Sequence, residues 1–445
     1  MDRLADLDQR LKERAKVAVI GGGWSGLAAA VELVAQGVNV TLFEAARQLG
    51  GRARGVEVNG LLLDNGQHIL IGAYRETLRL MRQVGLDPDK QLRRIPLELN
   101  YPAGAFLMKL PRMPAPLNLA LGLLCTKGIG IREKRSAARF MRSLQSTDYR
   151  LHCDCSVAEL LDRHNQSGRL RRFMWEPLCL AALNTAPENA SAQIFANVLR
   201  DSLGGKRADT DLLLPATDLS NLLPNAASAF IREFGGQIHL STRVQEFSPE
   251  LEILGRRFDH IILAVAPQHA AHFLEKHEET TVIAEILKCY RYEPIGTVYA
   301  AYPSGVQLPC PMLGLDDGRN DRLGQWVFAR GMDSTDKPEA DVATILAFVL
   351  SARGAWDTHD ADTLMHSLHR ELEQTLGRSL PLPAWHRVIR ERRATFSCRP
   401  NLPRPAAKTQ IPGLWLAGDY VCADYPATLE GAIRSGVAVA RAILA

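Results

Sequence analysis

Three glycines near the N-terminus have the spacing of a diphosphate-binding turn. Gly21, Gly23 and Gly26 form the pattern G-x-G-x-x-G, and Glu44 follows the last of them by eighteen residues. In this pattern the first glycine permits a tight turn, the second lets the backbone approach a diphosphate, and the third lets a helix pack closely on a strand. A carboxylate at the position of Glu44 can accept hydrogen bonds from ribose hydroxyls. The spacing predicts a dinucleotide site.

The segments around these glycines predict the elements that such a site needs. An apolar run at 17–20 predicts a buried parallel strand, the small-residue segment 24–36 predicts a helix, and 38–43 predicts the next strand. In this βαβ unit the N-terminus of the helix faces the diphosphate with its free N–H groups. Because strand, helix and acidic residue fall in register, the signal is stronger than the glycine pattern alone.

Two further segments favour a flavin over a nicotinamide cofactor. The tripeptide GGR at 50–52 follows the second strand, where an NAD enzyme has no evident need of glycines and a fixed cation. Near the C-terminus an apolar strand at 414–417 leads into Gly418 and Asp419, and a helix is expected to begin at 428–431. The glycine lets the backbone approach a ligand, and the carboxylate can accept from hydroxyl groups.

Together the segments GGWSGL, LGGRAR and LWLAGDY with PATLEGAIRSG resemble the FAD-binding parts of the flavin amine oxidase and phytoene desaturase superfamily. The resemblance implies an α/β fold with a discontinuous, Rossmann-like FAD-binding domain and an α+β substrate domain. FAD is expected to be non-covalent, because Cys398 and Cys422 lie in no convincing attachment motif. Beside the glycines and Glu44, the implied FAD-binding residues are Trp24, Ser25, Gly51, Arg52, Val244 (through its backbone, to the adenine), Gly418, Asp419, Thr428, Leu429 and Ala432.

The domain boundaries follow from where the chain is expected to return to the FAD domain. A helix and a strand are predicted within 230–244, and another buried strand within 258–267. The predicted FAD-binding domain comprises 1–95, 206–269 and 396–445, and the predicted substrate domain comprises 96–205 and 270–395.

The stretch WEPLCLAALNTAPENASAQIFANVLRDS at 175–202 is apolar at helical spacing. As a bare pattern this indicates core packing more often than a ligand pocket, although it suits a long hydrocarbon equally well. Its motif W-x-P-L…A-A-L-N-T-x-P, with LDNGQHILIGAY and ERRATF, resembles the hydroxysqualene dehydroxylases of the same superfamily. That resemblance implies reduction of hydroxysqualene to squalene in hopanoid or related triterpene synthesis, with an external electron donor.

Four polar or aromatic residues are candidates for the proton donor and the substrate pocket. His68 is the catalytic candidate, because it is expected near the flavin by resemblance and a histidine can donate at neutral pH, although a structural histidine is equally compatible with the sequence. Gln67, Trp175 and Asn184 are further candidates for the substrate pocket, since an indole face can stabilise a cation. The histidines at 366–369 lie in a charged helix without a third ligand, so they are predicted to be solvated and no metal is expected.

Composition and charge limit the binding partners and the cellular location that we expect for the protein. The net charge of +4 and pI of about 8.6 are mild, which argues against nucleic acid. The N-terminus lacks the apolar region of a signal peptide, and no window holds eighteen consecutive apolar residues, so a cytoplasmic or peripheral protein is expected. The segment 111–142 is apolar between basic flanks and predicts an interfacial helical region that touches anionic lipid, although a helix packed in the substrate domain fits as well.

Three other functions share most of these motifs. A carotenoid desaturase would remove hydride from a hydrocarbon, an amine oxidase would place paired aromatic rings beside the flavin, and a non-catalytic flavoprotein would only bind an isoprenoid. The direction of hydride transfer, which separates the dehydroxylase from the desaturase, does not follow from sequence.

Overall fold

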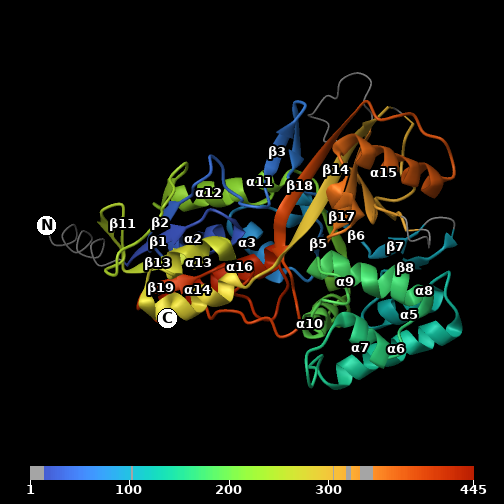
Figure 1. Cartoon of the computed structure of the whole chain (residues 1–445), viewed down its shortest axis with the longest axis horizontal. Helices are drawn as coiled ribbons and strands as arrows, with labels where there is room; N and C mark the ends of the chain where they lie inside the picture. The colour runs from blue at the N-terminus through green and yellow to red at the C-terminus, as the bar shows by residue number, and fades with distance from the viewer. Residues whose placement is uncertain (1–14, 102–103, 304, 317–321, 331–343) are drawn as a thin grey trace.

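The computed structural model describes residues 15–101, 104–303, 305–316, 322–330 and 344–445. Figure 1 shows a lobe with a parallel sheet at one end of the molecule, and a lobe with an antiparallel sheet and a group of helices at the other. The long strands β14 (Tyr292–Tyr302) and β18 (Trp385–Phe396) run between the two lobes.

The parallel sheet has the strand order β10-β2-β1-β13-β19. Its strands are β1 (Lys16–Ile20), β2 (Asn39–Phe43), β10 (Gln237–His239), β13 (His260–Leu263) and β19 (Leu414–Leu416), and all neighbours are parallel. Val17 and Val19 pack in one core, while Ala18 and Ile20 pack in the core on the opposite face. The strand β1 is therefore buried on both sides, which explains its uninterrupted apolar run.

Helices cover both faces of this sheet. On one face α2 (Trp24–Ala35) contacts α12 (Pro224–Glu233) and α16 (Leu429–Leu444). The contact of α16 with α2 is close because Gly436 has no side chain: a Cβ there would lie 2.1 Å from the backbone oxygen of Ser25. On the other face α13 (Pro267–Leu274) and α14 (Thr281–Lys288) contribute to the second core.

Most of the predicted elements of this lobe are confirmed. The strand–helix–strand unit expected at 17–43 corresponds to β1, α2 and β2, and the strand expected within 258–267 is β13. The expected position of Val244 in a strand is wrong. The strand β10 ends at His239, and Val244 is buried in irregular chain after a residue in the left-handed region, Ser241, at φ 52°.

Smaller elements connect the lobes. A hairpin of β3 (Gly55–Val58) and β4 (Leu61–Asp64) follows the first βαβ unit. A three-stranded sheet has the order β5-β9-β6. The remaining elements here are β5 (Leu70–Ile71), α3 (Arg75–Gln83), α4 (Pro88–Gln91), β6 (Leu92–Ile95), η3 (Arg207–Thr210), β9 (Leu212–Pro215), α11 (Leu219–Leu222), β11 (Glu252–Ile253), β12 (Arg256–Arg257) and η4 (Glu278–Thr280).

The antiparallel sheet has the order β15-β16-β17-β14-β18. With β14 and β18 it contains β15 (Met312–Gly314), β16 (Trp326–Arg330) and β17 (Thr344–Ser351), followed by η5 (Ala355–Thr358) and α15 (Ala361–Leu376). One face packs on α15, whose His369 is buried and hydrogen-bonds the Tyr302 hydroxyl at 3.0 Å. His369 is thus not the solvated residue predicted from its charged neighbours.

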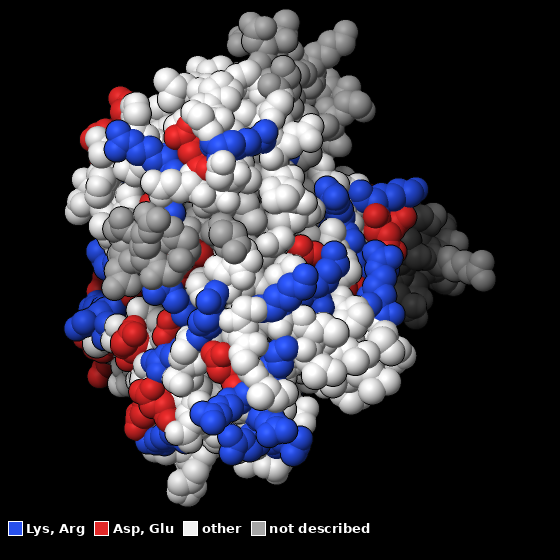
Figure 2. Space-filling view, turned by 90° about the vertical axis from the view of Figure 1, so that its right-hand side faces the viewer, with Lys and Arg blue, Asp and Glu red and all other residues white. Residues whose placement is uncertain are grey.

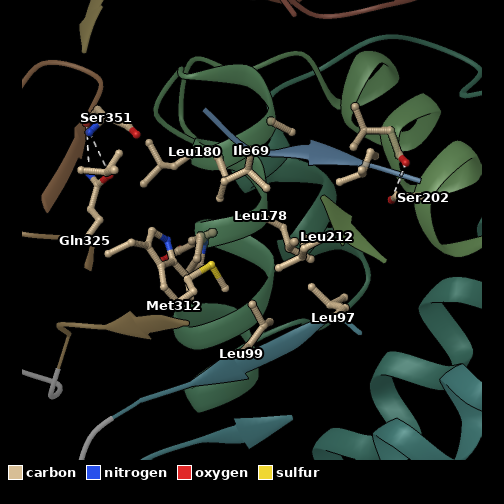
Figure 3. Close-up of a pocket in the computed structure, with 18 of the residues that line it drawn as sticks. Ile69, Leu97, Leu99, Leu178, Leu180, Ser202, Leu212, Met312, Gln325 and Ser351 are labelled. Carbon is tan, nitrogen blue, oxygen red and sulfur yellow. Dashed lines mark hydrogen bonds between the residues drawn. The ribbon is translucent and has the colours of Figure 1, made fainter. Parts of the chain in front are cut away.

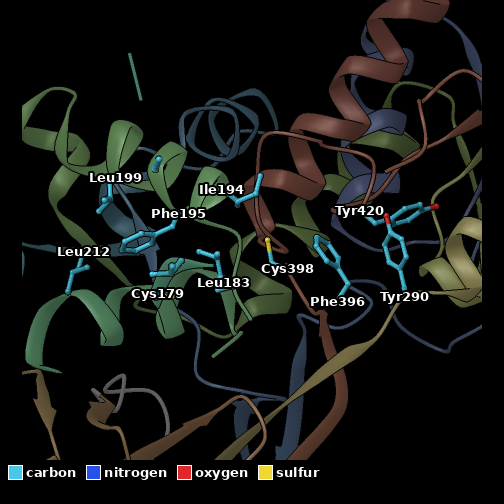
Figure 4. Packing of buried hydrophobic residues seen from close by; sticks show 14 of the residues in the cluster. Cys179, Leu183, Ile194, Phe195, Leu199, Leu212, Tyr290, Phe396, Cys398 and Tyr420 are labelled. Atoms are coloured by element: carbon cyan, nitrogen blue, oxygen red, sulfur yellow. The ribbon is translucent and has the colours of Figure 1, made fainter. Parts of the chain in front are cut away.

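The helical part of this lobe lies beside the sheet. It contains β7 (Glu98–Asn100), β8 (Leu107–Lys109), α5 (Leu117–Cys125), α6 (Ile131–Ser146), α7 (Val157–Arg163), α8 (Gly168–Leu170), η2 (Arg171–Trp175), α9 (Glu176–Leu183) and α10 (Ala192–Leu203). A continuous buried core runs from α9 and α10 to Phe396 and Tyr420 in the FAD lobe (Figure 4). The two lobes are therefore joined by apolar packing as well as by chain connections.

Three separated segments contribute strands to the parallel sheet, although the exact domain boundaries stay a prediction. The region predicted as one interfacial unit, 111–142, contains α5 and most of α6, with a turn between them. Among the described residues, no helix has both the length and the apolar character needed to cross a membrane.

Candidate active site

The three glycines of the first loop have different surroundings. A Cβ on Gly21, whose φ is 110°, would lie 2.4 Å from the Ala264 oxygen, and a Cβ on Gly26 would lie 2.0 Å from the Gly21 oxygen. A Cβ on Gly23, in contrast, would meet no described atom within 4 Å. The first and third glycines thus serve the turn and the helix contact, while the second faces open space, as a diphosphate-binding loop requires.

Polar groups near the start of α2 can form further hydrogen bonds with a ligand. The Glu44 carboxylate accepts hydrogen bonds from the N–H of Gly22 at 2.6 Å and of Ala46 at 2.8 Å. A carboxylate has about four acceptor sites, so it can also accept from a ribose. The hydroxyl of Ser25 is buried and has no hydrogen-bond partner within the described structure. An orphaned hydroxyl at a helix N-terminus fits a bound phosphate.

Trp24 has a structural role within the protein. Its ring is buried, and Nε1 donates to the backbone oxygen of Ala53 at 2.9 Å. This bond ties α2 to the loop that contains Gly51 and Arg52. A Cβ on Gly51 would lie 3.2 Å from the Cα of Gly23, so the two loops are in close contact.

Arg52 and Asp419, predicted from opposite ends of the chain, form an ion pair. Nη2 of Arg52 lies 2.7 Å from Oδ2 of Asp419, and Nη1 donates to the Ala394 oxygen at 2.7 Å. The Asp419 carboxylate raises the pKa of Arg52 above its ordinary value. Oδ1, the second oxygen of Asp419, takes no part in this ion pair. Through its two contacts Arg52 links the loop at 50–52 to the end of β18 and to the Gly418–Asp419 segment.

The closing helix α16 begins with a side-chain cap. The Thr428 hydroxyl accepts from the N–H of Gly431 at 3.0 Å, and Leu429 and Ala432 are partly buried beside it. Glu430 is fully buried and accepts hydrogen bonds from the N–H and hydroxyl of Thr77 at 2.9 and 2.7 Å. These bonds fix α3 against the N-terminus of α16.

The chain at 240–244 runs beside the end of β2. The N–H groups of Ser241 and Thr242 donate to the oxygens of Ala46 and Glu44, both at 2.9 Å. Val244, two residues after Thr242, is buried. Its contact with the adenine stays a prediction.

A cavity of about 860 Å³ extends from the N-terminus of α16 into the second lobe. Ligand pockets are usually about 300–1,000 Å³ and mostly apolar. Figure 3 shows the apolar side chains that converge on it from α9, from the β6–β7 region and from the antiparallel sheet. Its apolar lining includes Ile69, Ile71, Leu97, Leu99, Leu178, Leu180, Val198, Leu212, Met312, Trp326, Phe328 and Val349.

Polar side chains interrupt the apolar lining in two places. Tyr425, Pro426 and Thr428 line the cavity immediately before α16. Elsewhere in the lining the guanidinium of Arg172 pairs with the Asp316 carboxylate through two bonds of 2.8 and 2.9 Å. The cavity is therefore a mostly apolar chamber that reaches the segment before α16, at the predicted flavin end of the cofactor site.

The four predicted pocket residues separate into two groups. Gln67 lines the cavity, and its N–H donates to the Thr297 hydroxyl at 3.2 Å. His68 is half-buried next to it, but it is not among the lining residues. Trp175 and Asn184 lie outside the lining, which corrects the prediction for both.

Trp175 and Asn184 instead hold the second lobe together. The Trp175 ring is fully buried, and Nε1 donates to Gln166 at 3.0 Å. Asn184 ends α9 in the left-handed region; its amide donates to Thr395 at 3.0 Å and accepts from the N–H of Ala352 at 2.7 Å. Both polar groups are satisfied by protein, as buried polar groups normally are.

For the stretch 175–202 both interpretations hold, each for one face of its helices. Leu178, Leu180 and Val198 line the cavity, whereas Leu183 and Phe195 pack in the core (Figure 4). Apolar residues of one helix therefore either line the cavity or pack in the core, and apolar spacing alone does not distinguish the two.

His68 belongs to a buried polar group that the sequence did not indicate. Nδ1 of His68 lies 2.8 Å from the Gly66 oxygen, and Asp64 pairs with Arg330 at 2.9 Å. Burial lowers the pKa of His68, while the Gly66 contact and the Asp64 carboxylate act in the opposite direction. Arg330 comes from the antiparallel sheet, so no local signal could have linked it to Asp64.

Residues that sequence reasoning missed come from distant segments. Tyr74 and Tyr425 both line the cavity and meet edge to face at 6.5 Å. Trp326 and Gln325 also line the cavity, and Asp316 pairs with Arg172. Only the tertiary structure brings these residues to one cavity.

The fold and the site together define an FAD-dependent oxidoreductase. The chain belongs to the flavin containing amine oxidoreductase family, which it matches over residues 24–444. It is 29% identical to a hydroxysqualene dehydroxylase from Rhodopseudomonas palustris, over 96% of this chain and 98% of that protein. It is 27% identical to a hydroxysqualene dehydroxylase from Sinorhizobium fredii, over 94% and 96%.

Solved structures share the fold. A cyclohexylamine oxidase from Brevibacterium oxydans superposes with a TM-score of 0.69 at 19% identity, covering 97% of this chain and 98% of that one. FAD is therefore the cofactor, and the open space at Gly23, the orphaned Ser25 hydroxyl and the capped N-terminus of α16 fit it.

Proposed function

We propose that the protein reduces hydroxysqualene to squalene, as a step of hopanoid or related triterpene synthesis. The similarity to two hydroxysqualene dehydroxylases over nearly the whole chain supports this assignment. The observation that carries it is the mostly apolar cavity of about 860 Å³ that reaches the N-terminus of α16. A polyisoprenoid, unlike a small amine, uses an apolar wall along its whole length.

Binding of the hydrocarbon is driven by the cavity lining. Each Å² of apolar surface removed from water contributes about 25 cal/mol. The converging leucines in Figure 3 provide this surface, and the polar Gln67 lies where the lining approaches His68. We infer that the hydroxyl-bearing carbon is held near Gln67, with the rest of the hydrocarbon in the apolar part of the cavity.

The reaction replaces a C–OH bond by a C–H bond. Bound FAD, once reduced by an external donor, supplies the hydride, and the hydroxyl leaves with a proton as water. A positioned proton donor lowers the barrier by protonating the hydroxyl as it leaves. An apolar wall that excludes water protects the substrate carbon, which gains positive character, from capture by water.

His68 is the proposed proton donor. Its Nδ1 lies beside the Gly66 oxygen, so Nδ1–H donates there and Nε2 is the nitrogen that can take up and pass on a proton. The nearby Asp64 carboxylate favours the protonated form, against the effect of burial.

We also propose that the protein is cytoplasmic and lies on the inner face of the cytoplasmic membrane. Leu117 and Leu124 of α5 are 54% and 57% exposed, and Ile131, the first residue of α6, is 55% exposed. Exposed leucines with basic neighbours are typical of segments that rest in a lipid interface. Such a position would let a water-insoluble substrate enter from the bilayer.

The deciding experiment is an anaerobic incubation of the FAD-loaded protein with a chemical reductant and hydroxysqualene in detergent, followed by mass spectrometry of the extracted lipid. Squalene that forms only with reduced flavin supports the dehydroxylase. Flavin reduction by an unsaturated polyisoprenoid, without squalene formation, would instead identify a desaturase. Bound lipid without turnover in either direction would leave a non-catalytic flavoprotein.

A further inference from the structure

A second cavity lies next to the substrate cavity, across β7. Leu99 of β7 lines the substrate cavity, whereas the preceding Glu98 lines the second one, which has a volume of about 640 Å³. Successive side chains of a strand point to opposite sides, so β7 separates the two spaces. The second cavity is bounded by β7, β8, α5 and the segment before β15.

The helix α5 packs against this cavity with an unusual polarity. Its buried residues are Asn118 and Gly122, while Leu117 and Leu124 are exposed. A Cβ on Gly122 would lie 2.3 Å from Leu110, so the absence of a side chain lets the helix approach β8 closely. The flank of α5 that carries Leu121 and Cys125 lines the second cavity, whereas Leu117 and Leu124 face outward.

A cationic groove adjoins the apolar cavity. It has a volume of about 350 Å³, shares Pro96 and Arg112 with the second cavity, and is lined further by Arg94, Arg207 and Asp211. Asp211 pairs with Arg94 at 3.3 Å and with Arg207 at 3.0 Å. The groove is therefore lined by three guanidinium groups and one carboxylate, and two of the guanidinium groups pair with that carboxylate.

Arg112 is the cation best placed to meet a ligand. It is exposed, and within the described residues it forms no ion pair, whereas Lys109 of the same cavity pairs with Glu98 at 2.9 Å. Figure 2 shows the side of the molecule formed by this lobe, where lysine and arginine side chains, with acidic side chains among them, border uncharged surface. An apolar chamber with an unneutralised guanidinium at its rim matches an amphiphile with an anionic head.

We propose that the second cavity and the adjoining groove bind an anionic phospholipid, with an acyl chain beside Leu121 and Cys125 and the phosphate at Arg112, Arg94 and Arg207. The inference deepens the membrane contact proposed above and rests on it. The bound lipid would fix the orientation of α5 at the bilayer, so that the protein prefers anionic membranes.

The thiol of Cys125 offers a direct test, because it is exposed and lines the cavity. Alkylation of the FAD-loaded protein by N-ethylmaleimide is followed by peptide mass spectrometry, with vesicles of phosphatidylglycerol or of phosphatidylcholine. Phosphatidylglycerol is expected to slow alkylation of Cys125 at least about fivefold, the effect of one basic residue near an anionic surface. The exposed Cys153 and Cys289 serve as internal controls and should react at unchanged rates.

Two variants separate a headgroup site from general attraction. Arg112→Gln should abolish the protection of Cys125, whereas Arg139→Gln, which removes an exposed cation from α6, should keep it. Equal protection by phosphatidylcholine, equal loss in both variants, or no protection would overturn the proposal. Protection by farnesyl diphosphate but not by phosphatidylglycerol would overturn it as well, because the site would then hold a prenyl diphosphate. The readout uses neither flavin chemistry nor hydroxysqualene, so it fails independently of the dehydroxylase assay.

Discussion

The cofactor loops and the apolar cavity are built in opposite ways. The cofactor loops depend on backbone geometry: glycines at 21, 26 and 51 allow contacts that any side chain would obstruct or strain. The cavity depends on side chains from many elements, and its lining residues extend from Gln67 to Thr428 in the sequence. Loss of one loop glycine should therefore disable the protein, whereas loss of one lining residue should only alter what it binds.

The largest expected effect separates two glycines of the same loop. Gly26→Ala places a methyl 2.0 Å from the Gly21 oxygen, so the free energy of unfolding should fall by more than about 3 kcal/mol and FAD should be lost. Gly23→Ala meets no described atom, so the apoprotein should keep its stability within about 1 kcal/mol. Its FAD affinity should nevertheless fall at least about tenfold, since every 1.4 kcal/mol is tenfold.

Urea unfolding of the two apoproteins and the flavin absorbance of the two holoproteins measure these effects. If both variants lost stability equally, Gly23 would be a packing residue and the assignment of the diphosphate position would be wrong.

A second test addresses His68, the proposed proton donor, which follows Gln67 of the cavity lining. His68→Gln should lower the rate of squalene formation about a hundredfold, the low end of the contribution of a general acid. FAD content should stay unchanged. Because burial lowers the pKa of His68 and only its protonated form donates, wild-type turnover should rise as the pH falls from 7 through that lowered pKa.

The pH profile distinguishes a donor from a structural histidine. A glutamine variant with a flat profile over the same range agrees with proton donation. A variant that is slower but keeps the wild-type pH dependence would show that another group titrates.

The third test concerns the ion pair that joins the two ends of the chain. Arg52→Ala leaves the Asp419 carboxylate, 7% exposed, without its partner. Since the Arg52 side chain is 37% exposed and screened, we expect a loss of about 1–3 kcal/mol rather than the larger cost of a fully buried pair. Thermal unfolding with and without FAD measures it. Arg52→Lys should recover only part of the loss, because a lysine cannot contact Asp419 and Ala394 in the same bidentate way.

The smallest effect is expected in the cavity. Leu178→Trp fills part of the chamber, so the KM for hydroxysqualene should rise or turnover should fall about tenfold, within the range for a disturbed apolar pocket. FAD content and stability should change little, because Leu178 borders empty space. Leu382→Trp, at a position 65% exposed and outside the cavity lining, is the matched control and should behave as wild type. Loss of FAD in Leu178→Trp would contradict the separation of the two regions.

Local sequence predicted the cofactor lobe because its determinants are local. The contact of Gly26 with Gly21, the strands on either side of α2 and the cap at Thr428 depend on residues close in sequence, so glycine spacing and apolar runs predicted them. The position of Val244 was less predictable, because its strand ends early where the chain turns at Ser241.

The cavity is different because helical spacing shows that a residue is buried but not against what. Trp175 and Leu178 belong to the same apolar stretch, yet one lies in the core and the other lines the cavity. Asp64 meets Arg330, and Arg172 meets Asp316, only after sheets and helices from distant segments have packed. The sequence alone thus predicted the dinucleotide loop and the strands around it, through backbone rules that act over short distances, and it predicted FAD through its resemblance to known flavoproteins. The tertiary structure decided the cavity, its polar lining residues and the exposure of Leu117 and Leu124 on α5, because each depends on packing between segments far apart in the chain.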